Sequence, residues 1–387
     1  MPTTPAKNLL YRAALPILAP RSRGQMTHHV FGHPLTTLPN YERILAKHHV
    51  FGASLLLQDG ANCALCDTST ANPEHLAQEN TLYRVASITK MATALVTLRC
   101  IDNGLFALDS EAASLLPDGE KTPALSGVTV RQLLCHTSGL RDLPILDDCL
   151  KEGKPYTELL RQPEIRACAP GQQLIYSNFG FGLLGCILEQ QTGLCIEPLF
   201  QEMLFRPLHM RATLDASMLN EAEIMPITRV LPYRAGQELR VTALGRHPLQ
   251  KPNPLCHYGH TAGAMYTDGR SVLQMLTLIY QRGTMDETRL IGESLMREMT
   301  RRQSATPTRT YGLGLVILNR PEISPRQLLG HQGFAYGCVD GAFIEEETGR
   351  AVVFLNGGAS EARTGRLGLV NRDVLQWALK QEMPSWT

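Results

Sequence analysis

The residue types best suited to chemistry begin with Ser87-Ile-Thr-Lys90, where a serine and a lysine are three residues apart. Positions i and i+3 share one face of a helix, so the Lys90 amine can reach the Ser87 hydroxyl. A serine hydroxyl is a poor nucleophile until an adjacent base takes its proton. The motif predicts Ser87 as a nucleophile assisted by Lys90, although alone it also suits a serine that caps a helix beside a solvated lysine.

A second motif, Tyr176-Ser-Asn178, supplies a candidate proton carrier. A tyrosine beside a cation can have its pKa lowered and then acts as a general base. The Asn178 amide both donates and accepts hydrogen bonds, which suits the recognition of a substrate amide. The alternative is a loop tyrosine that only packs against the start of a helix.

A third motif, His331-Gln-Gly333, stands at the end of a predicted strand and is followed by Phe334. Gly333 has no side chain and lets a substrate approach the backbone closely. The backbone N–H groups of Ser87 and Phe334 would then form the two donors of an oxyanion hole. Taken alone, His331 is more typical of a structural histidine.

The first motif opens an apolar helix that follows a predicted hairpin. Residues 51–58 predict a strand, Asp59-Gly60 a turn, and residues 61–66 the partner strand. Between residues 87 and 103 apolar side chains cover nearly the whole predicted helix, and Gly104 ends it. A helix this apolar is expected to be buried in the middle of a domain.

Helical patterns fill the centre of the chain, and strand patterns return near its end. The helical patches lie within residues 109–302, where the irregular stretch 220–256 suggests a long loop or lid. Four further strands and a closing helix are predicted at residues 312–319, 327–330, 337–345, 351–356 and 363–380. This order predicts an α/β (α+β) fold, in which one antiparallel sheet is built from both chain ends and flanked by helices, with a mainly helical region inserted between them.

In order and spacing, the three motifs resemble those of the serine β-lactamase and penicillin-binding-protein family. The form Tyr-x-Asn is similar to the branch that holds class C β-lactamases, D-Ala-D-Ala carboxypeptidases and esterases. The resemblance runs from about Tyr41 to the C-terminus, with further similar stretches at residues 130–140, 170–193, 206–210, 311–315 and 330–358. It implies a β-lactamase/transpeptidase-like fold.

The resemblance also implies a role for each motif residue and requires no metal or organic cofactor. It implies that Ser87 is the nucleophile and that Lys90 and Tyr176 form the proton-relay pair. The implied substrate-binding residues are Asn178, His331, Gly333 and Phe334. The backbone amides of the nucleophile and of the residue after the third motif would hold the oxyanion. Which member of the relay pair removes the serine proton stays open, because the two titrate as a coupled unit.

The third motif departs from the family pattern, because His331 stands where a lysine is usual. A neutral histidine holds a substrate carboxylate more weakly than a permanent cation, and His-x-Gly resembles esterases, D-amino-acid peptidases and amidases. We therefore expect a serine hydrolase that cleaves a small amide, ester or lactone through an acyl-enzyme on Ser87. The alternatives are a true β-lactamase or D-Ala-D-Ala carboxypeptidase, an acyltransferase, a non-catalytic binding module on the same fold and, last, a metal-dependent hydrolase.

Composition bounds the partners of the chain. With 37 basic and 36 acidic residues the formal charge is +1, so neither nucleic acid nor an anionic membrane is expected as a partner. No integral membrane segment is expected either, because the apolar stretch at residues 9–19 is far too short to span a bilayer. The expected partner is a small-molecule or short-peptide substrate, and the oligomeric state stays open. Ten cysteines, including the pair Cys63-Ala-Leu-Cys66, favour buried thiols in a reducing, cytoplasmic compartment.

The N-terminus is predicted to be a separate basic segment. No acidic residue precedes Glu42, and the apolar stretch at residues 9–19 is interrupted by Arg12 and Pro16. These features favour an extension or helix over residues 1–28, although a weakly amphipathic targeting segment would share them. The remaining residues, 29–387, form the hydrolase domain, with its α/β part at about 29–104 and 305–387 and its helical part at about 105–304.

Overall fold

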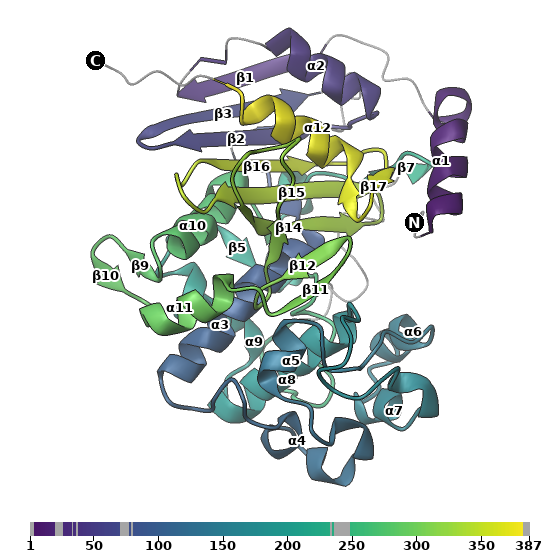
Figure 1. The fold of residues 1–387 in the computed structure, drawn as a ribbon, viewed down its shortest axis with the longest axis vertical. Coiled ribbons are helices and arrows are strands. Elements are labelled where there is room, and N and C mark those ends of the chain that lie inside the picture. The colour runs from purple at the N-terminus through teal and green to yellow at the C-terminus, as the bar shows by residue number, and fades with distance from the viewer. Residues whose placement is uncertain are drawn as a thin grey trace.

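A nine-stranded antiparallel sheet, assembled from both ends of the chain, forms one layer of the molecule (Figure 1). The computed structural model describes residues 4–19, 26–32, 34–35, 38–69, 77–78, 80–232, 234–235 and 248–381. The strand order is β1-β3-β2-β16-β15-β14-β13-β12-β11. The N-terminal strands are β1 (Thr27–Gly32), β2 (Ala53–Asp59) and β3 (Asn62–Ser69). The C-terminal strands are β11 (Ser304–Thr306), β12 (Arg309–Tyr311), β13 (Val316–Leu318), β14 (Leu328–Ala335), β15 (Cys338–Glu345) and β16 (Ala351–Asn356).

The two ends of the chain join at the pair β2–β16, where Ala53 lies opposite Asn356. Neighbouring strands pair antiparallel throughout, from β1–β3 at one edge to β11–β12 at the other. The fold class predicted from the strand patterns at both chain ends is therefore confirmed. Closing such a sheet needs contacts across some 300 residues, which the buried apolar faces stabilise.

Helices cover both faces of the sheet. On one face α2 (Leu38–Lys47) packs beside α12 (Leu369–Ala378), and the rings of Tyr41 and Trp377 stack with centroids 5.1 Å apart. On the other face lie α10 (Gly269–Tyr280) and α3 (Thr89–Asp102), the apolar helix that follows Ser87. Eleven of the fourteen α3 residues are buried, as its apolar composition predicts.

The inserted region lies on the far side of α3 from the sheet (Figure 1). Its helices are α4 (Ala112–Leu115), α5 (Val130–Leu134), α6 (Leu146–Lys151), α7 (Thr157–Leu160), α8 (Asn178–Thr192) and α9 (Ile196–Phe200), whereas α11 (Glu293–Thr300) lies beside α3 nearer the sheet (Figure 1). Short strands complete the inserted region and the domain border: β4 (Tyr83–Arg84), β5 (Ala212–Thr213), β6 (Thr228–Arg229), β7 (Arg234–Ala235), β8 (Tyr266–Thr267), β9 (Thr284–Met285), β10 (Thr288–Arg289), β17 (Arg363–Thr364) and β18 (Leu367–Gly368).

Three element boundaries differ from the sequence prediction. The single strand expected at residues 312–319 is wrong, because a turn between β12 and β13 packs Gly314, at φ +67°, against α3. The strand expected at 327–330 continues to Ala335, so His331-Gln-Gly333 lies inside β14 rather than at its end. The closing helix begins at Leu369, not at residue 363, since the ribbon β17–β18 precedes it.

The N-terminal segment contains a helix, α1 (Pro5–Leu18), that leans on the loop before β17 (Figure 1). The Asn8 side-chain amide donates to the Arg363 carbonyl and accepts from the Arg363 N–H, and the Glu361 N–H donates to the Tyr11 hydroxyl. Strand β1 begins at Thr27, so the sheet takes in the last residues of the expected extension.

The segment predicted as a loop or lid, residues 220–256, is only partly described, since 233 and 236–247 lie outside the described residues. The pair Cys63 and Cys66 lies on strand β3, where residues three apart face opposite sides of the sheet. Within the described chain, no single helix is long and apolar enough to cross a bilayer. Helix α8 and the helical segment Ile196–Phe205 reach that length and apolar composition only when taken together, and they are bent by 86° at the break between them.

Candidate active site

Ser87 lies in a tight turn between the sheet and helix α3. The turn is a 3₁₀ helix, Ala86–Ile88, and Ala86 adopts a positive φ of +46°. The Thr89 hydroxyl holds this turn, donating to the Ala86 carbonyl at 2.6 Å and accepting from the Met265 N–H at 3.1 Å. A non-glycine residue in this conformation is strained, and such strain persists only where surrounding contacts fix the backbone. The turn leaves the Ser87 side chain partly exposed.

The Lys90 amine lies completely buried one helical turn beyond Ser87. Its Nζ is 3.2 Å from Ser87 Oγ, 2.8 Å from Asn178 Oδ1 and 2.6 Å from the Ala262 carbonyl oxygen. Burial lowers the pKa of Lys90 to about 7, although the Asp142 carboxylate opposes this shift. A neutral amine has two N–H donors and one lone pair. With the amide and carbonyl oxygens accepting its two hydrogens, the lone pair is left for the Ser87 hydroxyl.

Tyr176 closes the other side of the nucleophile. Its hydroxyl donates to Ser87 Oγ at 2.8 Å, and its ring lies against His136 with centroids 4.3 Å apart. The expectation that a nearby cation lowers the pKa of Tyr176 is wrong, because burial raises that pKa strongly and outweighs the opposing hydrogen bond to Ser87 and the charge of Arg309. The phenol is therefore protonated around neutral pH and acts as a hydrogen-bond donor in this arrangement.

Asn178 is oriented by a carboxylate that the sequence analysis did not identify. Asp142 accepts hydrogen bonds from the Asn178 side-chain amide at 2.7 Å, the Phe179 N–H at 2.9 Å and the Ser177 hydroxyl at 3.1 Å. Because the nitrogen of the Asn178 amide points to Asp142, its oxygen faces Lys90. Helix α8 begins at this point, so the carboxylate also sits near a positive helix end.

His331 projects from strand β14 into the same buried space. Its Nδ1 lies 2.8 Å from the Gln332 carbonyl oxygen, so Nδ1 carries the proton and donates. Burial, followed by the Lys90 charge, lowers the pKa of His331 to about 3. Nε2 is then an acceptor, and it has no hydrogen-bond partner among the described residues. The third motif therefore presents a neutral acceptor where the family pattern has a cation.

Gly333 is in contact with the nucleophile turn. A Cβ at this position would lie 2.3 Å from the Val85 carbonyl oxygen and 3.3 Å from the Ala86 Cβ. The structural demand for glycine is therefore the close packing of β14 on the turn that carries Ser87. The next residue, Phe334, lies under the Arg363 guanidinium, whose carbon is 3.9 Å from the ring centroid.

Gly333→Ala is expected to lower the free energy of unfolding by roughly 1–3 kcal/mol, the range for overpacking a dense site. It should also lower activity, because the turn at Ser87 has to move. Urea unfolding with parallel kinetics measures both effects. Gly180→Ala is the matched control, since its Cβ would meet its neighbours only at 3.6 Å. An unchanged Gly333→Ala protein would contradict this account of the contact.

All seven predicted site residues lie on three segments that meet near Ser87, namely the turn before α3 with the first residues of that helix, the residues that lead into α8, and strand β14. Three further contributors are Asp142, His136 and the Ala262 carbonyl, which the sequence analysis did not identify. His136 also accepts from the Ser177 N–H at 3.3 Å and adopts a φ of +61°. In the sequence, His136 was indicated only by its place in the family-like stretch at residues 130–140. The Ala262 carbonyl could not be identified from sequence, because every residue has a backbone carbonyl.

One group of residues in the described chain has the composition of a metal site. Ligand atoms of Glu189, Cys195 and His257 lie within 4.8 Å of one another. The Glu189 carboxylate, however, already accepts from His257 Nδ1 at 2.7 Å and from two backbone N–H groups, of Ile196 and Asn253. These bonds account for the buried carboxylate, which fastens the segment before residue 260 to α8.

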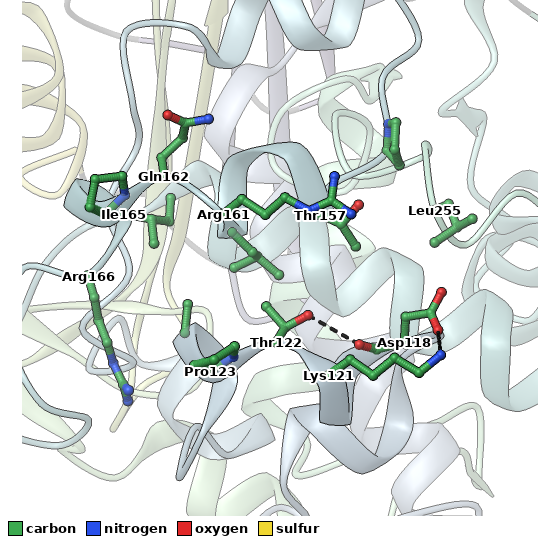
Figure 2. Close-up of a pocket in the computed structure, with 14 residues that line it drawn as sticks. Asp118, Lys121, Thr122, Pro123, Thr157, Arg161, Gln162, Ile165, Arg166 and Leu255 are labelled. Atoms are coloured by element: carbon green, nitrogen blue, oxygen red, sulfur yellow. Dashed lines mark hydrogen bonds and ion pairs between the residues drawn. The ribbon is translucent and has the colours of Figure 1, made fainter.

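A cavity of about 910 Å³ lies in the helical region, and none of the motif residues lines it (Figure 2). Its wall includes Lys121, paired with Asp118, and Arg161, whose charged partner is Glu158. A second cavity, of about 130 Å³, lies beside the site and is bordered by Tyr311 and Gln332.

Residues 40–373 match the family model described as Beta-lactamase. Esterase EstB of Burkholderia gladioli is 27% identical over 350 residues, which cover 80% of this chain and 85% of the esterase. Penicillin-binding protein 4 of Amycolatopsis lactamdurans is 28% identical over 225 residues, 52% of this chain and 58% of that protein. D-alanyl-D-alanine-carboxypeptidase/endopeptidase AmpH of Escherichia coli is 30% identical over 146 residues, 35% of this chain and 37% of AmpH. The chain thus spans little more than half, or less, of the length of the last two relatives.

Solved structures share the fold at low sequence identity. D-amino acid amidase from Ochrobactrum anthropi SV3 superposes with a TM-score of 0.71 at 22% identity, covering 89% of this chain and 98% of the amidase. The octameric penicillin-binding protein homologue from Pyrococcus abyssi gives a TM-score of 0.67 at 19% identity, covering 88% and 76%. With the family model spanning most of the chain and the three motifs gathered around one serine, this chain belongs to the β-lactamase family.

Proposed function

We propose that this chain is a serine hydrolase that forms an acyl-enzyme on Ser87 and cleaves a small amide, ester or lactone. The observation that carries the proposal is the position of Ser87 Oγ, within hydrogen-bonding distance of both Lys90 Nζ and the Tyr176 hydroxyl. A nucleophile, a base and a proton donor on rigid elements are the parts that acyl transfer requires.

In the acylation step, neutral Lys90 takes the Ser87 proton as Oγ attacks the substrate carbonyl carbon. The carbonyl oxygen becomes an oxyanion, for which the backbone N–H groups of Ser87 and Phe334 are the proposed donors. Tyr176, which stays protonated because burial raises its pKa, donates a proton to the departing oxygen or nitrogen. The C–O or C–N bond then breaks, and the proton on Lys90 replaces the one that Tyr176 gave.

In a hydrolase, water then attacks the acyl-enzyme and releases the acid, and the same residues carry the protons in the reverse order. Asn178 is proposed to hold the substrate amide or carbonyl, since its side chain is fixed between Asp142 and Lys90. The finer points of the assignment stay predictions: the identity of the acyl group, transfer to an acceptor other than water, the oligomeric state and a cytoplasmic location.

Slow or absent β-lactam turnover is expected, measured as nitrocefin hydrolysis by the purified protein. A β-lactam carries its carboxylate a few bonds from the scissile carbonyl, where this site offers the neutral His331. A neutral acceptor repels rather than binds a carboxylate oxygen. Rapid, saturable nitrocefin hydrolysis that disappears in Ser87→Ala would contradict the expectation and favour a true β-lactamase.

Activity is expected to rise with pH through an apparent pKa near 7. Burial disfavours the ammonium form of Lys90, so below about 7 the amine is protonated and cannot take the serine proton, whereas above it the lone pair is free. The value belongs to the coupled unit of Lys90, Tyr176 and Ser87 rather than to one residue. A profile of kcat/KM against pH measures it, and a flat profile from pH 5 to 9 would contradict a lysine base.

The proposal is tested by intact mass spectrometry after exposure to a fluorophosphonate probe. A single adduct on the wild type and none on Ser87→Ala would support an activated serine at this position. No adduct on a folded wild type would favour the non-catalytic binding module, because a probe of this kind needs a nucleophile rather than a binding pocket.

A further inference from the structure

The small cavity beside the active site is lined by three arginines. It lies between the hairpin β11–β12, the end of β13 and the ribbon β17–β18, and has a volume of about 130 Å³. We call it the arginine pocket and define it by Arg309, Arg320, Arg366, Thr308 and Gln332. None of the described residues that line it is acidic. The pocket therefore carries positive charge that its own wall does not neutralise.

The arginine pocket is separated from the nucleophile by one side chain. The Arg309 guanidinium carbon lies 5.8 Å from the centroid of the Tyr176 ring, and the Tyr176 hydroxyl donates a hydrogen bond to Ser87. Gln332, another wall residue, is the middle residue of the third motif and is held by the backbone of the β17–β18 ribbon through bonds to Arg366 O and Gly368 N. The pocket is therefore adjacent, through Arg309, to the tyrosine that contacts the nucleophile.

Two of the three arginines in the pocket have no acidic partner among the residues that the structure describes. Arg309 is half-buried, and neither it nor the exposed Arg366 makes a side-chain hydrogen bond or ion pair with any residue that the structure describes. Burial lowers the pKa of Arg309, and the neighbouring charge of Arg366 acts in the same direction. Arg320 differs, since it is 3.5 Å from the Glu322 carboxylate. A half-buried guanidinium without a counter-ion is costly unless a ligand supplies the negative charge.

We infer that the arginine pocket binds a carboxylate of the substrate, so that the enzyme acts on esters or amides whose acyl group ends in a negative charge. The inference rests on the proposed acyl-enzyme at Ser87. A guanidinium offers a planar fork of donors that matches a carboxylate in two parallel hydrogen bonds. The pocket volume suits a carboxylate rather than a larger group, and its place beyond Tyr176 requires several bonds between this carboxylate and the scissile carbonyl.

The test uses 4-nitrophenyl monoesters of linear dicarboxylic acids of increasing length. The methyl esters of the same compounds serve as neutral isosteres, and the readout is the ratio of kcat/KM for the acid to kcat/KM for its methyl ester. At the best length the wild-type ratio is expected to exceed about ten, the effect of one charged hydrogen bond. Added salt should lower the ratio, because it screens the charges.

Arg309→Gln and Arg366→Gln are each expected to lower this ratio about tenfold, mainly through KM for the acid. Arg297→Gln is the matched control, an exposed arginine on α11 paired with Glu293, and should leave the ratio unchanged. If Arg309 only positions Tyr176, its variant will lower kcat equally for both esters and keep the ratio, which would overturn the inference. A wild-type ratio near one at every length would overturn it as well.

Failure of this inference is distinguishable from failure of the proposed function. Fluorophosphonate labelling of the wild type reports on Ser87 alone, because the probe carries no carboxylate. Labelling together with a ratio near one would leave the serine hydrolase standing and remove the arginine pocket as a substrate site. Absence of labelling would remove the proposed function itself.

Discussion

Ser87→Ala is expected to lower kcat/KM for a 4-nitrophenyl ester by at least about 10³-fold, as loss of a nucleophile does in serine hydrolases. The alanine methyl group keeps the Cβ in the turn Ala86–Ile88, so the backbone has no reason to move. What disappears is the oxygen that lies within hydrogen-bonding distance of both Lys90 Nζ and the Tyr176 hydroxyl. Stopped-flow or steady-state measurement of 4-nitrophenol release gives the size of the effect, and circular dichroism shows whether the fold is retained.

Ser114→Ala is the matched control for that loss. Ser114 is an exposed serine in the helical region whose hydroxyl donates to the Glu111 carbonyl, so its variant should keep wild-type activity. Residual turnover above one-tenth of wild type in Ser87→Ala would show that another group carries the chemistry. The acyl-enzyme on Ser87 would then have to be abandoned.

Lys90→Met is expected to lower kcat by about 10²–10⁴-fold, the usual contribution of general acid–base help. Methionine keeps most of the buried volume but has no proton acceptor comparable to an amine. The same variant should lose the rise of activity near pH 7, because the titrating group of that limb is gone. A pH profile of the variant therefore separates a catalytic lysine from one that only packs. Lys121→Met, at an exposed lysine, is the control.

Tyr176→Phe extends this prediction to the proton donor. The phenyl ring preserves the stacking on His136 and removes only the hydroxyl that lies 2.8 Å from Ser87 Oγ. A loss of about 10²–10⁴-fold in kcat is expected for the same reason. Tyr258→Phe is matched to it, because that hydroxyl bonds a backbone carbonyl, of Lys154, in the helical region. An unchanged kcat in Tyr176→Phe would show that its role is misassigned.

The sequence was most informative where function depends on local spacing. Serine and lysine three residues apart meet on any helix, so the contact of Ser87 with Lys90 follows from the motif itself. Strand patterns at the two ends of the chain likewise sufficed for the antiparallel sheet, because alternation of apolar residues is a local signal. The motif boundaries were less certain: β14 runs on through His331 to Ala335, since pairing with β15 sustains a strand that the sequence pattern ends earlier.

The electrostatic state of the site was decided only by the tertiary structure. A side chain's pKa depends on what covers it, and the segments that cover Lys90, around Asn178 and Ala262, are 88 and 172 residues away in the chain. The same burial reverses the expected direction for Tyr176 and makes His331 a neutral acceptor. The sequence by itself determined which groups can react and in what order they occur along the chain. Desolvation and long-range contacts, which no local pattern encodes, decided the protonation of these groups. They also decided that Asp142 orients Asn178 and that the charge of Arg309 is left uncompensated.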